Sequence, residues 1–118
     1  MNDAMRRGPP SLEEIKAQVE KPKKAVVTGG MPYANGPIHL GHLAGAHIPP
    51  DIYARWLRML IGKDNVLFVF GTDDHGSTSE LSALKAGKPV QEFIAEIHSQ
   101  QKKSFEKYSI SFDVYSGT

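Results

Sequence analysis

Residues 25–42 read AVVTGGMPYANGPIHLGH, and this stretch decides how the rest of the sequence is interpreted. Its first four residues are short, apolar and mostly β-branched, and two glycines follow, which is the pattern of a buried strand that ends in a turn. Residues 31–39 are rich in proline, glycine and asparagine and predict a loop. Helical character begins at Leu40, so the stretch predicts a strand, a loop and a helix start.

Helical spacing continues from residue 40 to residue 60 or 61. The pair Pro49-Pro50 should break or kink this helix, so we expect a second segment to begin at Asp51. Apolar residues at helical spacing form the expected inner face of that segment: Ile52, Trp56, Met59 and Leu60. Three basic residues are expected to face water: Arg55, Arg58 and Lys63.

The rest of the chain alternates between strands and helices. Residues 62–65 predict a turn, and residues 66–70 predict a strand because they are wholly apolar and precede Gly71. A helix is expected over residues 77–86, closed by Gly87, and another opens at Pro89. The apolar stripe of this last helix is expected to contain Val90, Phe93, Ile94, Ile97, Phe105 and Tyr108. Residues 112–115 predict a third strand.

The N-terminal 23 residues are expected to form a tail and a short helix. Ser11 and Glu14 match a capping box at the start of a helix over about residues 12–20. Residues 24–118 follow the order strand, helix, strand, helices, strand. This order predicts an α/β fold, the first half of a Rossmann-like nucleotide-binding domain with three parallel strands and crossover helices. Because an open parallel sheet needs helices on both faces, we expect this domain to be incomplete.

Composition excludes several classes of protein. The chain has 118 residues, of which 40% are hydrophobic and 23% charged, so it is not disordered as a whole. A net charge of +1 predicts no strong electrostatic surface for nucleic acid. The sequence has no cysteine, which excludes a disulfide framework within it and is compatible with a cytoplasmic protein. No apolar run approaches the ~20 residues that span a bilayer, so no membrane association is expected.

Two histidines stand where the predicted loop meets the predicted helix. His39 and His42 are three residues apart and therefore share one face of the helix start. Unpaired backbone N–H groups and the positive end of the helix dipole lie there too, and Gly41 leaves the backbone open to a bulky ligand. These features predict a phosphate site, one that can stabilise extra charge while a phosphoryl group is attacked.

A second polar segment, residues 71–76, follows the second predicted strand and reads GTDDHG. Open α/β sheets bind ligands beyond the carboxyl ends of their strands, so this segment and the loop before His39 are expected to form one site. Asp73 and Asp74 are also compatible with a simpler role as turn residues that cap the next helix. His75 is compatible with either a ligand contact or a local hydrogen bond.

These segments resemble a known family. His39-Leu40-Gly41-His42 resembles the HIGH signature of class I aminoacyl-tRNA synthetases, and the longer string over residues 32–42 is similar to that of the methionyl member. The stretch FGTDDHG over residues 70–76 resembles the second-strand motif of the same family. The valyl, leucyl and isoleucyl enzymes usually carry a proline-rich Asn-Val-Thr-Gly pattern before the signature. The resemblance runs from about Lys24 to the C-terminus.

The resemblance implies a methionine–tRNA ligase. Such an enzyme activates methionine with ATP to methionyl-adenylate and then moves the methionyl group to tRNA(Met), with Mg²⁺ accompanying the ATP. His39 and His42 would be catalytic. The implied ATP-binding residues are Asn35, Gly36, His39, Gly41 and His42. The implied methionine-binding residues are Gly30, Met31, Tyr33, Asp73 and His75, and Asp73 would pair with the α-ammonium group.

The sequence also departs from the family. The lysine-bearing KMSKS loop has no counterpart, since Lys102-Lys103-Ser104 lies in a predicted helix. The anticodon-reading helices and the zinc-bearing insertion of many relatives are also absent, so no zinc site is expected in this segment. We therefore expect an N-terminal part of the catalytic domain that is inactive alone and needs the rest of the synthetase chain or a C-terminal partner.

Three other interpretations remain open. The His-x-Gly-His site is compatible with a small nucleotidyltransferase that transfers AMP to a different acceptor. The chain could instead be a non-catalytic half that docks on a partner, which an exposed apolar sheet face would support. A zinc site built from His39, His42, His47 and Asp51 is a further alternative. Otherwise His47 and His98 are expected to be packing or surface residues.

Overall fold

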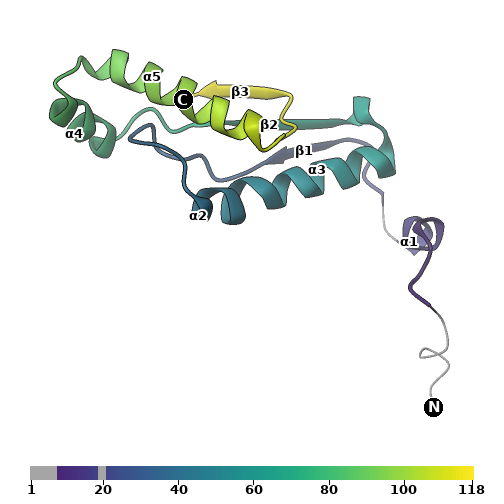
Figure 1. The fold of residues 1–118 in the computed structure, drawn as a ribbon. Helices are drawn as coiled ribbons and strands as arrows, with labels where there is room; N and C mark the ends of the chain where they lie inside the picture. Colours follow the sequence, from purple (N-terminus) through teal and green to yellow (C-terminus); the bar gives the residue numbers. More distant parts are fainter. Residues whose placement is uncertain (1–7, 19–20) are drawn as a thin grey trace.

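The computed structural model describes residues 8–18 and 21–118 (Figure 1). Its three strands are β1 (Ala25–Thr28), β2 (Val66–Thr72) and β3 (Val114–Gly117). They form one parallel sheet in the order β1-β2-β3, in which Val27 lies opposite Phe68 and Val69 lies opposite Val114. The predicted three-stranded parallel sheet is confirmed.

Helices connect and flank these strands. α1 (Leu12–Gln18) precedes the sheet, and α2 (Leu40–His42), η2 (Leu43–His47) and α3 (Ile48–Ile61) link β1 to the 3₁₀ turn η3 (Lys63–Asn65) and to β2. α4 (Ser77–Ala86) and α5 (Val90–Lys107) link β2 to β3. Gly87 closes α4 in the left-handed conformation at φ 66°, as expected for a glycine at a helix C-terminus.

The core lies on one face of the sheet. Alternate residues of β1 and β2 point to this face, where α3 and α5 cover them (Figure 1). Phe70 of β2 and Phe105 of α5 have ring centroids 6.1 Å apart, and Leu57 of α3 belongs to the same cluster. The cluster of buried apolar residues comprises Val27, Leu43, Ala54, Leu57, Val66, Phe68, Phe70, Phe105 and Ile110.

The opposite face of the sheet is uncovered. Val26 and Leu67 are register partners in β1 and β2, and they are 69% and 44% exposed. Val114 of β3 is also 44% exposed. The prediction of a buried first strand is therefore right for Val27 and wrong for Val26, because no helix of the described residues packs on that second face.

The prediction that Pro49-Pro50 break the helix is wrong. α3 begins at Ile48, three residues before the expected start at Asp51, and both prolines lie in its first turn. The first turn tolerates proline because its backbone N–H groups have no partner within the helix. The irregularity lies just upstream, where residues 43–47 form a π-helical turn.

The predicted inner face of α3 is right for Trp56, which packs against the core, and wrong for Ile52 and Met59. Ile52 and Met59 are 61% and 62% exposed, and the buried residues are Asp51, Ala54 and Leu57. The face is rotated because Asp51 accepts hydrogen bonds from the backbone N–H and the hydroxyl of Ser111, at 2.6 and 2.5 Å. A polar side chain with such partners is buried at lower cost than one without partners.

Arg58 does not face water as expected. Its guanidinium donates to the Ser111 hydroxyl at 2.6 Å, to the Ser111 carbonyl at 2.9 Å and to the Asp113 carboxylate at 2.9 Å. Asp113 also accepts from the Phe68 backbone N–H at 2.8 Å. These bonds use the backbone before β3, so strand pairing begins at Val114 and not at the predicted Phe112.

The helix termini agree with the sequence at α1 and differ at α5. The Ser11 backbone N–H donates to Glu14 at 2.7 Å and the Glu14 N–H donates to the Ser11 hydroxyl at 3.2 Å, which confirms the capping box. The expected end of this helix, residues 19–20, lies outside the described residues, as do residues 1–7 of the expected tail. In α5, Phe105 is buried as predicted but Tyr108 is 54% exposed. Among the described residues, none of the helices is both long enough and apolar enough to cross a membrane.

Candidate active site

The carboxyl ends of β1 and β2 are joined by an extra backbone pairing. The Asp73 N–H donates to the Pro32 carbonyl at 2.9 Å, and the Ala34 N–H donates to the Asp73 carbonyl at 3.1 Å. This isolated parallel bridge makes Tyr33 and Asp73 direct neighbours. The two polar segments that the sequence singled out therefore meet at one edge of the sheet, as expected.

His39 and His42 cap the start of α2 reciprocally. The His42 backbone N–H donates to Nδ1 of His39 at 3.3 Å, and the His39 N–H donates to Nδ1 of His42 at 3.2 Å. The two rings are stacked, with centroids 3.7 Å apart and planes 24° apart. Because each Nδ1 accepts a hydrogen bond, the neutral rings carry their hydrogen on Nε2. Two Nε2–H donors are thus available to a ligand at a helix N-terminus.

The surroundings of His42 favour its neutral form. Burial of the His42 ring, together with the neighbouring His39, lowers the pKa of His42 below its ordinary value. A proton on Nδ1 of either ring would also remove the acceptor that caps the helix. The pair therefore offers hydrogen-bond donors near neutral pH without two full positive charges at close range.

Glycine is required between the histidines for a reason beyond ligand access. A Cβ on Gly41 would lie 2.9 Å from Cε1 and 3.1 Å from Nδ1 of His39, so it would push the His39 ring from its place. Gly29 is constrained more tightly, since its Cβ would lie 2.3 Å from the Phe70 ring and 2.6 Å from the Ala46 carbonyl oxygen. Only glycine allows β1 to end against this part of the core.

The predicted methionine-binding side chains are accessible. Met31 is 48% exposed and Tyr33 is 51% exposed, and the Tyr33 ring lies near the backbone of Gly76. Gly30 has only the Ala46 side chain near its Cβ position, at 3.9 Å. Asp73 is partly exposed. The geometry gathers these four residues around the bridge between the strand ends.

The remaining predicted residues differ in their surroundings. Gly36 has open space where a side chain would stand, and Asn35 is exposed at the tip of the same turn. His75 has a local partner, because its Nε2 is 3.0 Å from the Thr118 carbonyl oxygen. A pocket of about 360 Å³ adjoins it and is lined by Asp74, His75, Gln91, Ile94, Ala95, His98, Gly117 and Thr118.

Asp74 has a local role, but it does not cap the next helix, because the N-cap of α4 is Gly76. The Thr72 hydroxyl donates to Asp74 at 2.5 Å and lies 2.6 Å from Nδ1 of His98. The Asp74 N–H donates to the Thr118 hydroxyl at 3.0 Å. His98 is therefore a packing residue, as expected, and it connects α5 to the end of β2.

Sequence reasoning missed Gln101. Its side-chain Nε2 donates to the carbonyls of Tyr33 and Gly36, at 3.0 and 2.8 Å, and the residue is 1% exposed. One signal was available: Gln101 stands four residues after Ile97 and four before Phe105, on the apolar stripe of α5. A polar residue at such a position needs a partner in the core.

His47 is a packing residue, as expected, and its surroundings do not suit the zinc alternative. Its ring lies between Phe70 and Phe105, with centroids 4.4 and 4.1 Å away, and its Nδ1–H donates to the His42 carbonyl at 2.7 Å. Burial and the nearby His42 lower the pKa of His47, although the His42 carbonyl opposes this. Asp51 is bonded to Ser111 and Arg55. In the described part of the chain, no three potential ligands gather to hold a metal ion.

A further pocket, of about 460 Å³, adjoins the histidine pair. It is lined by Ile38, His39, Leu40, Leu43, Ser104, Lys107 and Tyr108.

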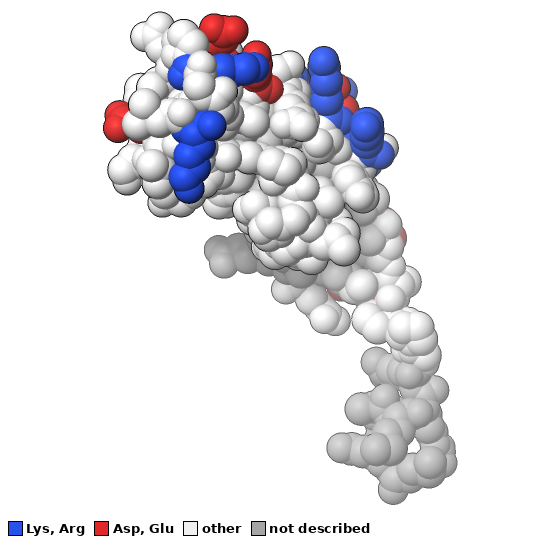
Figure 2. Space-filling view, turned by 60° about the vertical axis from the view of Figure 1, so that its left-hand side comes forward, with Lys and Arg blue, Asp and Glu red and all other residues white. Residues whose placement is uncertain are grey.

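On the face shown in Figure 2, lysine and arginine side chains stand in separate groups with acidic side chains close by. This face does not form a continuous basic surface, in agreement with the net charge of +1.

Comparison with known proteins identifies the family. A family model described as tRNA synthetases class I (M) matches residues 25–118. The chain belongs to this family. The expected start of the resemblance, at about Lys24, agrees with the match.

Relatives of this methionyl family are similar over most of the chain. A methionine–tRNA ligase of Bacteroides fragilis is 50% identical over 96 residues, which is 81% of this chain and 14% of that protein. One from Cytophaga hutchinsonii is 49% identical over 83% of the chain and 14% of its own length, and one from Pyrococcus abyssi is 50% identical over 79% and 13%. The chain thus spans about 14% of the curated relatives it matches.

A solved structure shows the same fold. Mycobacterium tuberculosis methionyl-tRNA synthetase, bound by methionyl-adenylate, superposes with a TM-score of 0.73 and 31% sequence identity. The superposition covers 80% of this chain and 18% of that one. The predicted Rossmann-like fold of a class I synthetase is confirmed.

Proposed function

We propose that the chain supplies the nucleotide-binding N-terminal part of a methionine–tRNA ligase. By full-length ligase we mean a protein of the relatives' kind that contains this chain. It activates methionine with ATP and charges tRNA(Met). The observation that carries this proposal is the pair of Nε2–H donors on His39 and His42 at a helix start, beside the bridge between Tyr33 and Asp73. The relatives named methionine–tRNA ligase support it.

The ATP side of the proposed site lies along residues 35–42. His39 and His42 donate from Nε2 to the phosphates and stabilise the charge that develops when the methionine carboxylate attacks the α-phosphorus and pyrophosphate leaves. The turn at Asn35 and Gly36 and the bare backbone at Gly41 give the nucleotide room to approach. Catalysis is then mostly positioning and electrostatics, with Mg²⁺ accompanying ATP as in other phosphoryl chemistry.

The methionine side lies around the bridge between the strand ends. The carboxylate of Asp73 pairs with the α-ammonium group, a charge-assisted contact that leaves the methionine carboxylate free to attack. Gly30, Met31 and Tyr33 line the approach of the substrate, and the half-exposed Tyr33 ring is available for apolar contact. His75 shapes the rim through its bond to Thr118.

The uncovered sheet face fits a chain that needs further structure. Val26, Leu67 and Val114 expose apolar surface that a stable protein normally covers. This surface is compatible with the full-length ligase and equally with a half that docks on a separate partner. We favour the ligase because the relatives carry the corresponding segment within one chain.

The other proposals follow from the same assignment. Residues 24–118 are the catalytic portion and residues 1–23 are an appended tail and helix, since α1 buries no residue and the family match begins at residue 25. The tRNA-reading surface and any zinc site lie in other segments of the ligase. Its setting is the cytoplasm, with which the absence of cysteine is compatible.

Pyrophosphate exchange into ATP tests the proposal. The full-length ligase should exchange only when methionine is present, and the chain alone should show little or no exchange. Exchange that depends on a different acceptor would support the nucleotidyltransferase alternative. If the ligase shows no exchange under any condition but the chain binds a partner tightly, the non-catalytic alternative is correct.

A further inference from the structure

Gln101 holds the turn that connects the two halves of the proposed site. Its single NH₂ group donates to the carbonyl of Tyr33 at 3.0 Å and to that of Gly36 at 2.8 Å. These carbonyls lie at the two ends of the turn 33–36, so one side chain from α5 spans it. On its other side the same turn is tied to β2 through the bond from Ala34 to Asp73.

The chemistry of this contact specifies an amide. Both hydrogen-bond partners are carbonyl oxygens, so the side chain must present two N–H donors, which one glutamine NH₂ group supplies. The flipped amide would place Oε1 against two oxygens and is excluded. A carboxylate of the same size would be repelled, and a methionine would leave both carbonyls without this partner. Oε1 has no hydrogen-bond partner among the described residues.

A buried unpaired Oε1 is a cost that packing alone does not explain. Gln101 lies between apolar positions of α5, where a leucine or methionine would fill the space with a side chain that has no polar atom of its own to leave unpaired. The amide at this position is explained by the turn 33–36, which it holds in place. Tyr33 stands at the start of this turn on the methionine side, and Asn35 and Gly36 lead to His39 on the ATP side.

We infer that Gln101 is a positioning residue for methionyl-adenylate formation. Its amide fixes the turn 33–36 and so sets the spacing between the methionine-side and ATP-side groups. It touches neither substrate. This inference rests on the proposed function and adds to it a residue on a helix outside the two sequence motifs.

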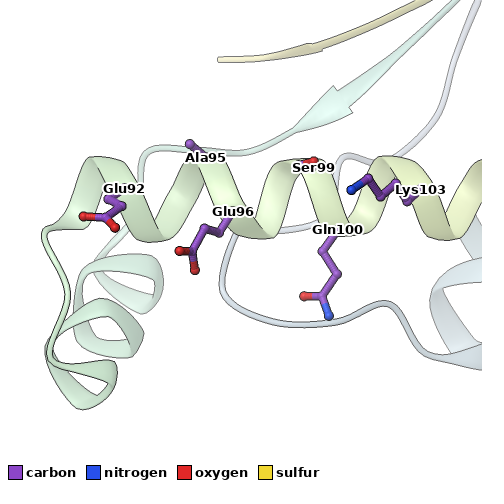
Figure 3. A pocket seen from close by; sticks show the side chains of 6 residues that line it. All are labelled: Glu92, Ala95, Glu96, Ser99, Gln100 and Lys103. Atoms are coloured by element: carbon purple, nitrogen blue, oxygen red, sulfur yellow. The ribbon is translucent and has the colours of Figure 1, made fainter.

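A matched pair of variants tests the inference in the full-length ligase. Gln101→Met removes the donors and keeps the length of the side chain. Gln100→Met makes the same change one residue earlier, where the side chain is exposed and lines an open pocket together with Glu96 and Lys103 (Figure 3). The measurements are kcat and KM for methionine and for ATP in pyrophosphate exchange, taken well below the unfolding temperature.

Misplacement of the turn should lower kcat/KM for both substrates by roughly 10- to 100-fold in Gln101→Met, and saturation with both should not restore kcat. Gln100→Met should stay within about two-fold of wild type, as exposed substitutions usually do. If Gln101→Met lowers only the unfolding temperature and keeps wild-type kinetic constants, Gln101 is merely structural and the inference is overturned.

A second variant adds a readout that a packing role would not move. In Gln101→Glu, a protonated carboxyl can donate one hydrogen bond to the turn, and a carboxylate can donate none. The ratio of its kcat/KM to that of the wild type should therefore fall as pH rises, whereas the ratio for Gln101→Met should not change with pH. A pH-independent ratio for Gln101→Glu contradicts the inference.

The wild-type ligase provides a test that does not depend on either variant folding. The Ala34 amide, whose N–H donates to the Asp73 carbonyl, should exchange hydrogen slowly without substrates, because the turn is held in advance. Exchange at unprotected rates overturns the inference. If the wild-type ligase shows no methionine-dependent pyrophosphate exchange, the proposed function itself is refuted. If the ligase is active and the Gln101 variants keep wild-type kinetic constants, only the role of Gln101 is refuted.

Discussion

Two polar clusters lie at opposite ends of the sheet and differ in how their hydrogen bonds are used. We call His39 and His42 the imidazole pair. We call Asp51, Arg55, Arg58, Ser111 and Asp113 the carboxylate network. The pair bonds only to its own backbone through Nδ1 and leaves both Nε2–H groups available. The members of the network bond to one another, and these partners lie more than 50 residues apart in the sequence.

The two clusters teach how to separate function from structure in this fold. A buried carboxylate that receives several donors from the protein has little capacity left for a ligand and mainly supports stability. Asp51 is such a group, with donors from Ser111 and Arg55. An exposed imidazole with one free N–H donor contributes little to stability. Its removal should therefore be detected mainly as a lower reaction rate. Mutations in the pair should therefore change rates, and mutations in the network should change stability.

The largest effect is expected when both members of the pair are removed. His39→Ala combined with His42→Ala should lower kcat for adenylate formation in the full-length ligase by roughly 10³-fold, because each lost donor of this kind costs about 10²- to 10³-fold and the losses are not additive. The free energy of unfolding should fall by only about 1 kcal/mol, the usual cost of a lost helix cap. Single-turnover kinetics and thermal unfolding measure the two quantities, and equal damage to both would erase the distinction between the clusters.

Asp51→Ala should have the converse effect. Removal of this carboxylate leaves the Ser111 N–H and the Arg55 Nε–H without their acceptor and should lower the free energy of unfolding by about 2–4 kcal/mol. The kinetic constants of the folded ligase should stay at wild-type values. Asp64→Ala, in the exposed turn η3, is the control and should change stability by less than about 0.5 kcal/mol. Chemical denaturation compares them, and a normal stability for Asp51→Ala would show that the network is not structural.

A smaller effect is expected at Gly41. In Gly41→Ala the new Cβ meets the His39 ring at 2.9 Å, so the ring must move and kcat should fall by about 10-fold, the loss expected for a displaced catalytic group. Gly45→Ala is a matched control in the following π-helical turn, where a Cβ has open space within 4 Å. If both variants keep full activity, the position of the His39 ring is unimportant.

A fall in pH should lower the stability that the carboxylate network contributes, by less than the Asp51→Ala substitution does. Burial alone would raise the pKa of Asp51, but hydrogen bonds from Ser111 and Arg55 outweigh it and hold the pKa below its ordinary value. The pKa of Asp113 is lowered in the same sense by Phe68 and Arg58. A lowered folded-state pKa gives stability that is present above the unfolded value, about 3.9, and is lost as pH falls through the folded value.

The acid prediction can be checked with a neutral variant. Unfolding free energy should decline below about pH 4 in the wild type, and the decline should be shallower in Asp51→Asn, which has no carboxyl group to protonate. Denaturant titrations at several pH values measure this. Identical acid profiles for the two proteins would mean that Asp51 has the same pKa folded and unfolded.

Much of the fold could be predicted from the sequence because local signals agreed with the final structure. Residues 66–70 are apolar without interruption, and they form most of the central strand. Gly87 ends α4 as a glycine C-cap should. The meeting of the two polar segments was also predictable, since the strand-loop-helix order places residues 29–42 and 71–76 at one edge of the sheet.

The errors arose where distant residues decide the structure. The apolar pattern of α3 pointed to Ile52 and Met59, but Ser111 draws Asp51 inward from 60 positions away. The residues just before β3 are bonded in the same way, so this strand begins at Val114 and not at the predicted Phe112. Gln101 was missed because its partners are carbonyls, 65 and 68 residues earlier, that carry no side-chain signal. Such pairings are visible only in three dimensions.

The central claim is that His39 and His42 use Nδ1 to cap the helix and present Nε2–H donors to a triphosphate. Nitrogen-15 NMR of the histidine-labelled full-length ligase, assigned with His39→Ala and His42→Ala, reads the tautomer of each ring directly. We predict that near neutral pH both rings carry hydrogen on Nε2 and that both Nε2–H signals shift when a non-hydrolysable ATP analogue binds. Hydrogen on Nδ1 in either ring, or no response to the analogue, would contradict the account.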